Sequence, residues 1–287
     1  MSRPGCGAGA LRPRAGKISM NTKPINLKRA QAAAVQAARA VGVLLRRNLH
    51  ARKRAGMVTQ HDIKLELDVR SQKLIERTLQ RSYPKLALLG EEGTAGPADA
   101  DWRWVVDPID GTVNFAYGIP HACVSIALQQ RTEHPGVSTY EDGYRTVVGV
   151  VYDPFCQELW TALHGRPARL NGRIIHVSHR RKLGEAIISI GFAKTRENLE
   201  ATFPYFVDLI HRVRKIRIMG SAALALTYVS CGRFDAYIER GIRIWDIAAG
   251  GFIVECAGGQ FWRQAVGEHT YRVISSNGLL RRCLRAP

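Results

Sequence analysis

Five short runs of apolar and β-branched residues follow one another in the first half of the chain, and they constrain the fold more than any other feature of the sequence. Each run has the length and composition of a β-strand and is bounded by polar or turn-forming residues. We interpret them as strands of one largely antiparallel sheet, and the Asn-Gly pair at 171–172 predicts a tight turn after them. The runs are LALLG (86–90), WRWVVD (102–107), ACVSIAL (122–128), TVVGVVYD (146–153) and ELWTAL (158–163).

Two helices are expected before this sheet. Residues 26–49 are rich in Ala and Leu, and their apolar positions recur at helical spacing. A second helix is expected over residues 63–82. Both helices would pack on the sheet.

The pattern changes near residue 186 to alternating strands and helices. The predicted strands cover 186–191, 215–219 and 234–239, and the predicted helices cover 197–212, 221–232 and 245–259. Such alternation favours a mixed or parallel sheet with helices on its faces. We therefore expect an α+β fold with a boundary near Leu183, which divides the chain into an N-terminal α+β half, residues 26–183, and a C-terminal α/β half, residues 184–287.

Positive charge is concentrated at the N-terminal end. Residues 1–60 contain thirteen of the 42 Lys and Arg and none of the 24 Asp and Glu, so they supply +13 of the net charge of +18. A basic end of this kind could bind nucleic acid, an anionic membrane or an acidic protein. We favour a simpler interpretation, a solvated tail and a basic helix face, because no aromatic residue interleaves with these charges to stack on bases.

Residues 1–25 are expected to form a disordered basic tail, because the first nineteen are rich in Gly, Pro and Arg. No apolar segment follows them, which argues against a secretory signal, although an arginine-rich leader without acidic residues loosely resembles a transit peptide. Folded sequence that starts near Met20 is the plainer alternative. No apolar run reaches the length of about eighteen residues that a membrane span needs, so we expect no membrane partner.

The cysteines favour a cytoplasmic protein. Six are scattered along the chain without CxxC spacing, and several lie in apolar runs. Reduced, mostly buried thiols explain this pattern better than a disulfide framework or a zinc site.

The stretch WVVDPIDGTVNF, residues 104–115, ends an apolar strand with two aspartates three positions apart. Desolvated carboxylates need positive charge nearby, from a lysine, a helix N-terminus or a metal ion. The proline between Asp107 and Asp110 stiffens the turn, so that their side chains converge and the Ile109 carbonyl can supply a further oxygen. After them, Gly111 allows close approach of the backbone to a ligand, and Thr112 offers a hydroxyl and an N–H to an oxyanion.

Other acidic residues also stand at the ends of predicted elements. Glu91 and Glu92 follow a predicted strand, Asp68 lies on the second predicted helix, and Asp246 lies at the start of a later helix. A set of oxygen ligands suits Mg²⁺ far better than zinc, and the whole pattern fits metal-assisted phosphoryl hydrolysis. Taken alone, however, DPIDG has an equally good alternative explanation as an Asx-type turn that caps a helix.

Three motifs in a fixed order decide between these interpretations. With GEE at 90–92, WVVDPIDGTVNF at 104–115 and WDIAAGGFIVECAGG at 245–259, the chain resembles the inositol monophosphatase family. The resemblance runs from about Ile25 to the C-terminus. It implies a layered α/β/α/β/α sandwich whose N-terminal half binds the metal.

The resemblance also implies roles for individual residues. The metal ligands would be the side chains of Glu91, Asp107, Asp110 and Asp246 and the carbonyl of Ile109. The catalytic residues would be Glu91 and Thr112, which orient the attacking water, and Asp68, which helps to hold a further metal-bound water. Substrate would contact Glu91, Asp110, Gly111, Thr112, Ser221, Ala222, Glu239 and Asp246. Leu65 departs from the family, in which threonine is usual at this position.

The activity implied by the resemblance is that of a phosphoric monoester hydrolase that requires Mg²⁺ and is sensitive to lithium. It would cleave a small polyol phosphate, with myo-inositol 1-phosphate as the first choice, by means of metal-activated water, and it would act as a homodimer. Two alternatives stay open. One is a phosphatase for 3′-phosphoadenosine 5′-phosphate or for another nucleotide or sugar phosphate, and the other is a phosphatase scaffold whose basic N-terminal region binds RNA or a protein.

Overall fold

The computed structural model describes residues 25–51, 55–58, 63–132, 136, 138–192 and 195–284, with the backbone alone at 55–58 and 63–64. The predicted disordered tail at 1–25 lies outside the described residues, apart from residue 25. The residues on which the transit-peptide interpretation rests, and the alternative start of folded sequence near Met20, also lie outside the described residues.

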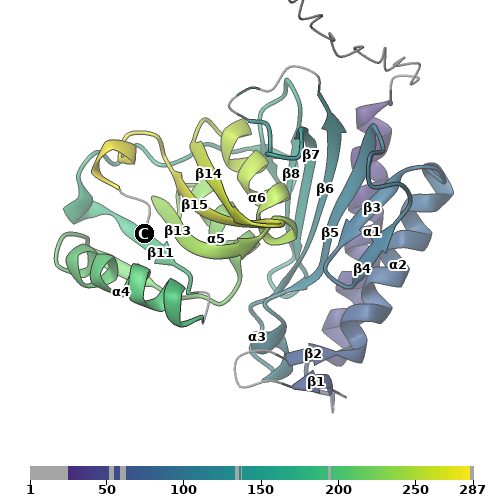
Figure 1. Ribbon diagram of the computed structural model, residues 1–287, viewed down its shortest axis with the longest axis horizontal. Coiled ribbons are helices and arrows are strands. Elements are labelled where there is room, and N and C mark those ends of the chain that lie inside the picture. Colours follow the sequence, from purple (N-terminus) through teal and green to yellow (C-terminus); the bar gives the residue numbers. More distant parts are fainter. Residues whose placement is uncertain are drawn as a thin grey trace, which may run out of the picture.

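The described elements stack in five layers (Figure 1). Helices α1 (Leu27–Asn48) and α2 (Glu66–Ser82) cover the outer face of a large sheet. Helices α5 (Ala222–Ser230) and α6 (Ile244–Cys256) lie between this sheet and a second one. Helix α4 (Arg196–Ile210) covers the outer face of the second sheet. This arrangement is the predicted α/β/α/β/α sandwich.

The first sheet is largely antiparallel, as predicted. In the described part of the chain it has eight strands in the order β10-β9-β8-β7-β6-β5-β3-β4, and only β3 and β5 pair in parallel. The predicted turn at Asn171 and Gly172 joins β9 to β10, and both residues have positive φ. The strands are β3 (Ala87–Gly90), β4 (Gly93–Ala95), β5 (Trp102–Asp110), β6 (Cys123–Arg131), β7 (Tyr144–Asp153), β8 (Glu158–Leu163), β9 (Arg169–Leu170) and β10 (Arg173–Ile174).

The second sheet is mixed, which also agrees with the prediction. Its order is β12-β11-β13-β15-β14, where β11 is parallel to both neighbours and the other pairs are antiparallel. The strands are β11 (Ile187–Ile190), β12 (Lys215–Arg217), β13 (Ala236–Arg243), β14 (Gln260–Gly267) and β15 (Thr270–Ser276). The predicted division near Leu183 falls between the last strand of the first sheet and the first strand of the second, and it stays a prediction.

Short elements account for most differences from the predicted pattern. The helix expected from residue 63 begins at Glu66, because residues 63–65 form strand β2 and pair with β1. The β14–β15 hairpin was not predicted, since charged and polar residues interrupt its apolar positions. The short elements are β1 (Ala55–Val58), β2 (Ile63–Leu65), α3 (Thr112–Ala116) and the 3₁₀ turns at Leu183–Glu185 and Arg281–Cys283.

Helix α6 is the centre of the molecule. It contacts strands of both sheets and is apolar on almost every side, as expected for a helix buried all round. Two glycines allow its close packing: a Cβ at Gly250 would lie 2.8 Å from the Leu226 Cβ, and one at Gly251 would lie 2.4 Å from the Phe261 ring. The spacing of the middle layer therefore depends on these two positions.

No helix in the described ranges is both long and apolar enough to cross a bilayer. Five of the six cysteines fall in these ranges, and all five are free thiols. The sixth, Cys6, lies outside the described ranges. The prediction that the cysteines are mostly buried is wrong, because only Cys123 of these five is buried, while Cys231 and Cys256 are partly exposed and Cys156 and Cys283 are exposed.

Replacing Gly251 with Ala tests the close packing of helix α6 against strand β14. Alanine has the higher helix propensity, by about 1 kcal/mol, yet its methyl group would overlap the Phe261 ring, and such overpacking typically costs about 1–3 kcal/mol. We expect the variant to have a lower melting temperature in thermal unfolding. Gly184→Ala is the control, because nothing lies within 4 Å of its added Cβ. An unchanged melting temperature for Gly251→Ala would contradict the close approach of α6 and β14.

Candidate active site

An irregularity at the end of β5 turns two carboxylates towards the same side of the sheet. Successive side chains of a regular strand alternate, so residues three apart would point to opposite faces. Asp107 pairs with Ser125 and Asp110 with Cys123, which gives β5 one residue more than β6 in this interval. Pro108 lies inside this bulge and lacks the N–H that a regular ladder would use.

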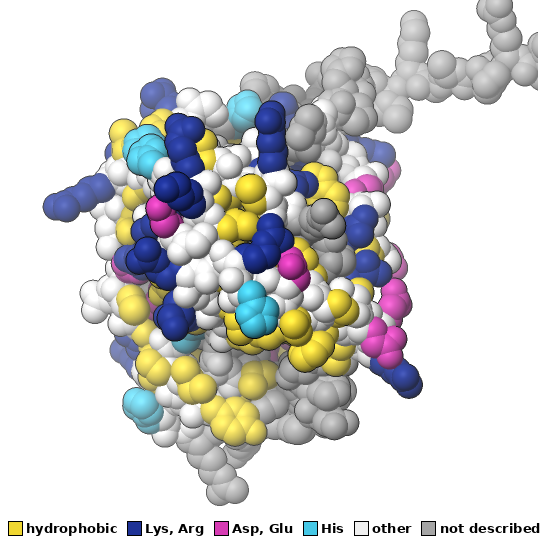
Figure 2. Space-filling view, turned by 90° about the vertical axis from the view of Figure 1, so that its left-hand side faces the viewer, with side chains coloured by type: hydrophobic (Ala, Val, Ile, Leu, Met, Phe, Trp, Pro, Cys, Tyr) yellow, Lys and Arg dark blue, Asp and Glu magenta, His cyan; other side chains and the backbone are white. Residues whose placement is uncertain are grey.

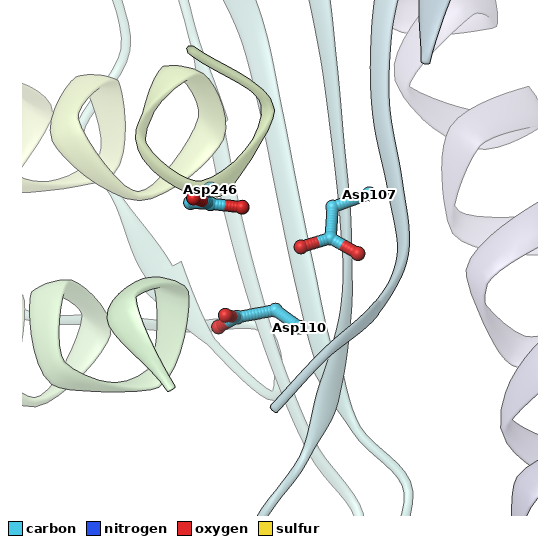
Figure 3. Close-up of side chains that lie close together, drawn as sticks. All are labelled: Asp107, Asp110 and Asp246. Atoms are coloured by element: carbon cyan, nitrogen blue, oxygen red, sulfur yellow. The ribbon is translucent and has the colours of Figure 1, made fainter. Parts of the chain in front are cut away.

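The side chains of Asp107, Asp110 and Asp246 converge from three directions (Figure 3). Each offers a carboxylate oxygen, and these oxygens all lie within 4.8 Å of one another. Asp246 comes from the first turn of α6, where one of its oxygens accepts a hydrogen bond from the Arg243 N–H at 3.1 Å. The two sheet residues and the helix residue thus form one group of carboxylates.

The carboxylate of Asp110 caps helix α5. It accepts hydrogen bonds from the Ser221 hydroxyl at 2.5 Å, from the Ala222 N–H at 3.2 Å and from the Ala223 N–H at 2.8 Å. The Cys123 thiol donates a weaker one at 3.6 Å. Negative charge is stabilised at a helix N-terminus, so α5 compensates part of the cost of burying this group.

The side chain of Asp107 forms a local turn. Its Oδ1 accepts a hydrogen bond from the Ile109 N–H at 2.9 Å, which is the Asx turn of the alternative interpretation. The Thr112 hydroxyl donates to the Ile109 carbonyl at 2.8 Å. The turn and the carboxylate group therefore coexist, because one oxygen of Asp107 is enough for the turn.

Burial and mutual repulsion disfavour the charged forms of these groups. The pKa of Asp107 is raised well above its ordinary value, by burial first and then by the charges of Glu91, Asp110 and Asp246. Burial and the charges of Asp110 and Glu91 also raise the pKa of Asp246 well above the ordinary value. For Asp110, burial raises the pKa while the bonds from Ser221 and the α5 backbone lower it.

Glu91 lies beside this group. It follows the end of β3, its N–H donates to the Val106 carbonyl at 3.2 Å, and its charge raises the pKa of both Asp107 and Asp246. The next residues are tied to α2 by Gln72, whose side chain accepts from the Glu92 N–H at 2.9 Å and donates to the Gly93 carbonyl at 3.0 Å. Helix α2 therefore sets the position of the loop that carries Glu91.

Asp68 is buried in the first turn of α2, and its Oδ2 accepts a hydrogen bond from the Leu65 N–H at 2.7 Å. Among the described residues it does not belong to the three carboxylates within 4.8 Å of one another. Strand β2, which ends at Leu65, contacts α3, and α3 begins at Thr112. The side chain of Leu65, at the end of this strand, is buried and has no hydroxyl.

Both the backbone conformation and the lack of space for a side chain require glycine at position 111. Its φ of 93° is left-handed, a conformation that favours glycine. A Cβ there would also lie 2.9 Å from the carbonyl oxygen of His121. The chain can therefore turn sharply after Asp110 and start α3 at Thr112.

A cavity of about 290 Å³ opens beside Asp110. Of the predicted substrate contacts, Ser221, Ala222 and Glu239 also line it. Glu239 is 8 % exposed, and its burial raises its pKa to about 7. The lining also includes Gly191 and Tyr237, which the sequence interpretation did not single out, since no motif marks them.

The donor set of this site suits a hard cation. Asp107, Asp110 and Asp246 present oxygen atoms alone, two of them are buried, and burial and the neighbouring carboxylates raise the pKa of Asp107 and Asp246. A small divalent cation such as Mg²⁺ prefers carboxylate and carbonyl oxygens. The residues present therefore fit a metal ion at this position.

Known proteins are similar to this chain in sequence and fold. The family model described as the inositol monophosphatase family matches residues 26–280. The protein named Nus factor SuhB from Xylella fastidiosa is 38% identical over 228 residues, 78% of each chain, and inositol monophosphatase 1 from Solanum lycopersicum is 36% identical over 258 residues, 86% of this chain and 90% of the relative. The solved inositol monophosphatase from Anabaena (Nostoc) superposes with a TM-score of 0.77 at 33% identity, covering 92% of this chain and 98% of that one.

The carboxylate group predicts an unusual response of the metal-free protein to the substitution Asp107→Asn. A raised pKa in the folded state means that stability is full below the ordinary pKa of about 4 and is lost as pH rises through the folded value. The substitution removes one buried charge and keeps the Asx-turn acceptor. We expect the melting temperature in EDTA to rise by about 2–4 °C near neutral pH, which corresponds to about 1 kcal/mol in a protein of this size.

Melting temperatures measured over a range of pH separate the effect of charge repulsion from an effect on packing. The gain from Asp107→Asn should shrink towards pH 4, where the parent carboxyl is protonated. A variant that is less stable than the parent at every pH would contradict the proposed repulsion. Thermal unfolding in EDTA from pH 4 to pH 8 measures both outcomes.

Proposed function

The chain belongs to the inositol monophosphatase family of metal-dependent phosphatases, and we propose that it hydrolyses a small polyol phosphate, most readily myo-inositol 1-phosphate, with Mg²⁺ as its cofactor. The observation that carries this proposal is the convergence of three aspartate side chains within 4.8 Å beside a cavity that contains Glu239. We propose the side chains of Glu91, Asp107, Asp110 and Asp246 and the Ile109 carbonyl as metal ligands. A homodimer, inhibition by lithium and a cytoplasmic location stay predictions.

Bound Mg²⁺ would supply positive charge that stabilises the phosphate oxygens and the oxygens of the bonds formed and broken. The protein groups around it would orient the reactants. The Thr112 hydroxyl donates a hydrogen bond to the Ile109 carbonyl, so its oxygen lone pairs are left to accept a hydrogen bond from the attacking water. Glu91, next to the carboxylate group, would accept the other proton of that water.

Phosphate and leaving group would lie on opposite sides of Asp110. The backbone N–H groups of Gly111 and Thr112 are proposed to face the phosphate. Ser221, Ala222 and Glu239 line the cavity on the other side, where the carboxylate of Glu239 can accept hydrogen bonds from hydroxyl groups. Asp68 is proposed to hold a water near the metal from the start of α2.

The size of the cavity favours a small leaving group. Its volume of about 290 Å³ lies near the lower limit of ordinary ligand pockets, about 300–1,000 Å³. A polyol with one ring fits this space more readily than a nucleotide such as 3′-phosphoadenosine 5′-phosphate. The buried carboxylate in its wall would also repel a second phosphate group.

A role in binding RNA or protein is a second candidate. Some relatives are named Nus factor SuhB, and residues 1–60 carry thirteen basic and no acidic side chains. Basic side chains also outnumber acidic ones on the face formed by the C-terminal half in Figure 2. Such a surface would bind a polyanion in addition to the phosphatase activity.

Metal dependence and the substitution Asp107→Asn test the phosphatase proposal. Hydrolysis of myo-inositol 1-phosphate should require Mg²⁺, stop in excess EDTA and recover poorly with Ca²⁺, which is larger. Asp107→Asn should lower kcat by at least about a hundredfold, because metal-centred charge contributes several kcal/mol and each ~1.4 kcal/mol is tenfold in rate. Mg²⁺ should also raise the melting temperature of this variant less than that of the parent.

The matched control is Asp208→Asn, an exposed residue of α4 that pairs with Arg212. Its kcat and Mg²⁺ response should equal those of the parent. Full activity in EDTA, or an Asp107→Asn variant at near-parent rate, would refute the metal mechanism.

The second candidate function, binding of RNA through basic side chains, predicts that binding weakens as the salt concentration rises. Retention of an RNA oligonucleotide should fall steeply between about 50 and 200 mM salt. It should also weaken when the chain is shortened to begin at residue 25, because this removes Arg3, Arg12, Arg14, Lys17 and Lys23. The shortened protein should keep its phosphatase activity. Retention that is unchanged by the truncation would exclude the basic tail as part of the binding element.

A further inference from the structure

Tyr237 and Glu239 lie two residues apart on strand β13, so their side chains leave the same face of the second sheet. Both are buried and both line the cavity beside Asp110. The Tyr237 hydroxyl donates a hydrogen bond to the Glu239 Oε2. The carboxylate is therefore anchored at one oxygen, while the other is not engaged by this bond.

Gly191 provides the space for this carboxylate. It follows β11, which is parallel to β13, and its N–H donates to the Ile238 carbonyl at 3.0 Å. A Cβ at position 191 would lie 1.7 Å from the Glu239 Oε2 and 2.2 Å from its Cδ. No side chain larger than hydrogen is compatible with Glu239 in this orientation.

We propose that Tyr237 and Gly191 are positioning residues that determine specificity for the leaving group: Tyr237 orients the Glu239 carboxylate, and Gly191 leaves the space that it occupies, so that its second oxygen accepts a hydrogen bond from a hydroxyl of a polyol. This inference rests on the proposed function. It adds two residues that act through Glu239 and do not themselves take part in the phosphoryl transfer.

The chemistry of the pair supports this role. The Tyr237 phenol keeps its proton and can donate it in a hydrogen bond to Glu239, because burial and then the charge of Glu239 raise the pKa of Tyr237 well above its ordinary value. A carboxylate that accepts one fixed bond keeps its remaining lone pairs for the substrate. Without the bond, the side chain would regain rotational freedom that substrate binding would have to remove.

Two substrates separate positioning from a general structural role. The probes are myo-inositol 1-phosphate, which carries hydroxyls beside the ester, and p-nitrophenyl phosphate, which carries none. The measured quantity is the ratio of kcat/KM for the first substrate to that for the second. In Tyr237→Phe this ratio should fall about tenfold, the effect of one hydrogen bond to a charged group, and mainly through KM.

A double-mutant cycle tests whether Tyr237 acts through Glu239. In the Glu239→Gln background, adding Tyr237→Phe should change the ratio by less than about twofold. Equal losses on both substrates in Tyr237→Phe would indicate a structural role and overturn the inference. A full tenfold loss in the Glu239→Gln background would overturn it as well.

The role of Gly191 is tested by Gly191→Ala. Its methyl group should displace Glu239, so the ratio should fall as far as in Glu239→Gln. The controls are Gly184→Ala, which faces open space, and Tyr140→Phe, a buried tyrosine outside the cavity. Both should keep the parent ratio, and a parent-like ratio in Gly191→Ala would refute the steric argument.

Crystal structures of the parent and of Tyr237→Phe provide a readout that does not depend on activity. The Glu239 carboxylate should face the cavity in the parent and rotate away in the variant. If the parent hydrolyses neither phosphate ester, the proposed function fails, and these structures still decide the inference. A carboxylate that keeps its orientation in Tyr237→Phe would exclude the positioning role.

Discussion

Repulsion among buried carboxylates is the constraint on which the rest of the structure depends. The bulge in β5 turns Asp107 and Asp110 to one side, and the first turn of α6 adds Asp246. Helix α5 stabilises the charged form of one of them, because its first N–H groups donate hydrogen bonds to the Asp110 carboxylate. The other two have pKa values raised well above the ordinary value, by burial first and then by the neighbouring carboxylates, which is the setting that a bound cation would stabilise.

The layered fold makes this convergence possible. The first sheet contributes the ends of β3 and β5, the middle layer contributes the starts of α5 and α6, and the second sheet contributes β13 with Glu239. Each of the two halves predicted from the sequence therefore holds only part of the site. The glycines of α6 bring the layers close enough for these parts to meet, which links core packing to the geometry of the carboxylates.

Much of this was predictable because its signals are local in the sequence. Long apolar runs identified the central strands, and the motif order named the aspartates that the structure brings together. The sequence of the β14–β15 hairpin shows no clear strand pattern, because charged and polar residues interrupt its apolar positions. The contacts of Cys123 with Asp110 and of Tyr237 with Glu239 depend on strand register and side-chain direction, which tertiary packing sets.

Folding and binding of the proposed metal ion would consequently be parts of one equilibrium. The raised pKa values of Asp107 and Asp246 favour protonation of the metal-free site, and a cation would have to displace these protons to bind. The same groups, which weaken the metal-free fold as pH rises, would stabilise the fold as ligands of that ion. Asp110 differs, because its hydrogen bonds from Ser221 and the α5 backbone lower its pKa against the effect of burial and so favour its charged form. Ser221, the N-cap of helix α5, binds Asp110 and also lines the cavity beside it. The polar contacts that hold this proposed ligand and the wall proposed to meet the leaving group therefore belong to one segment of the chain.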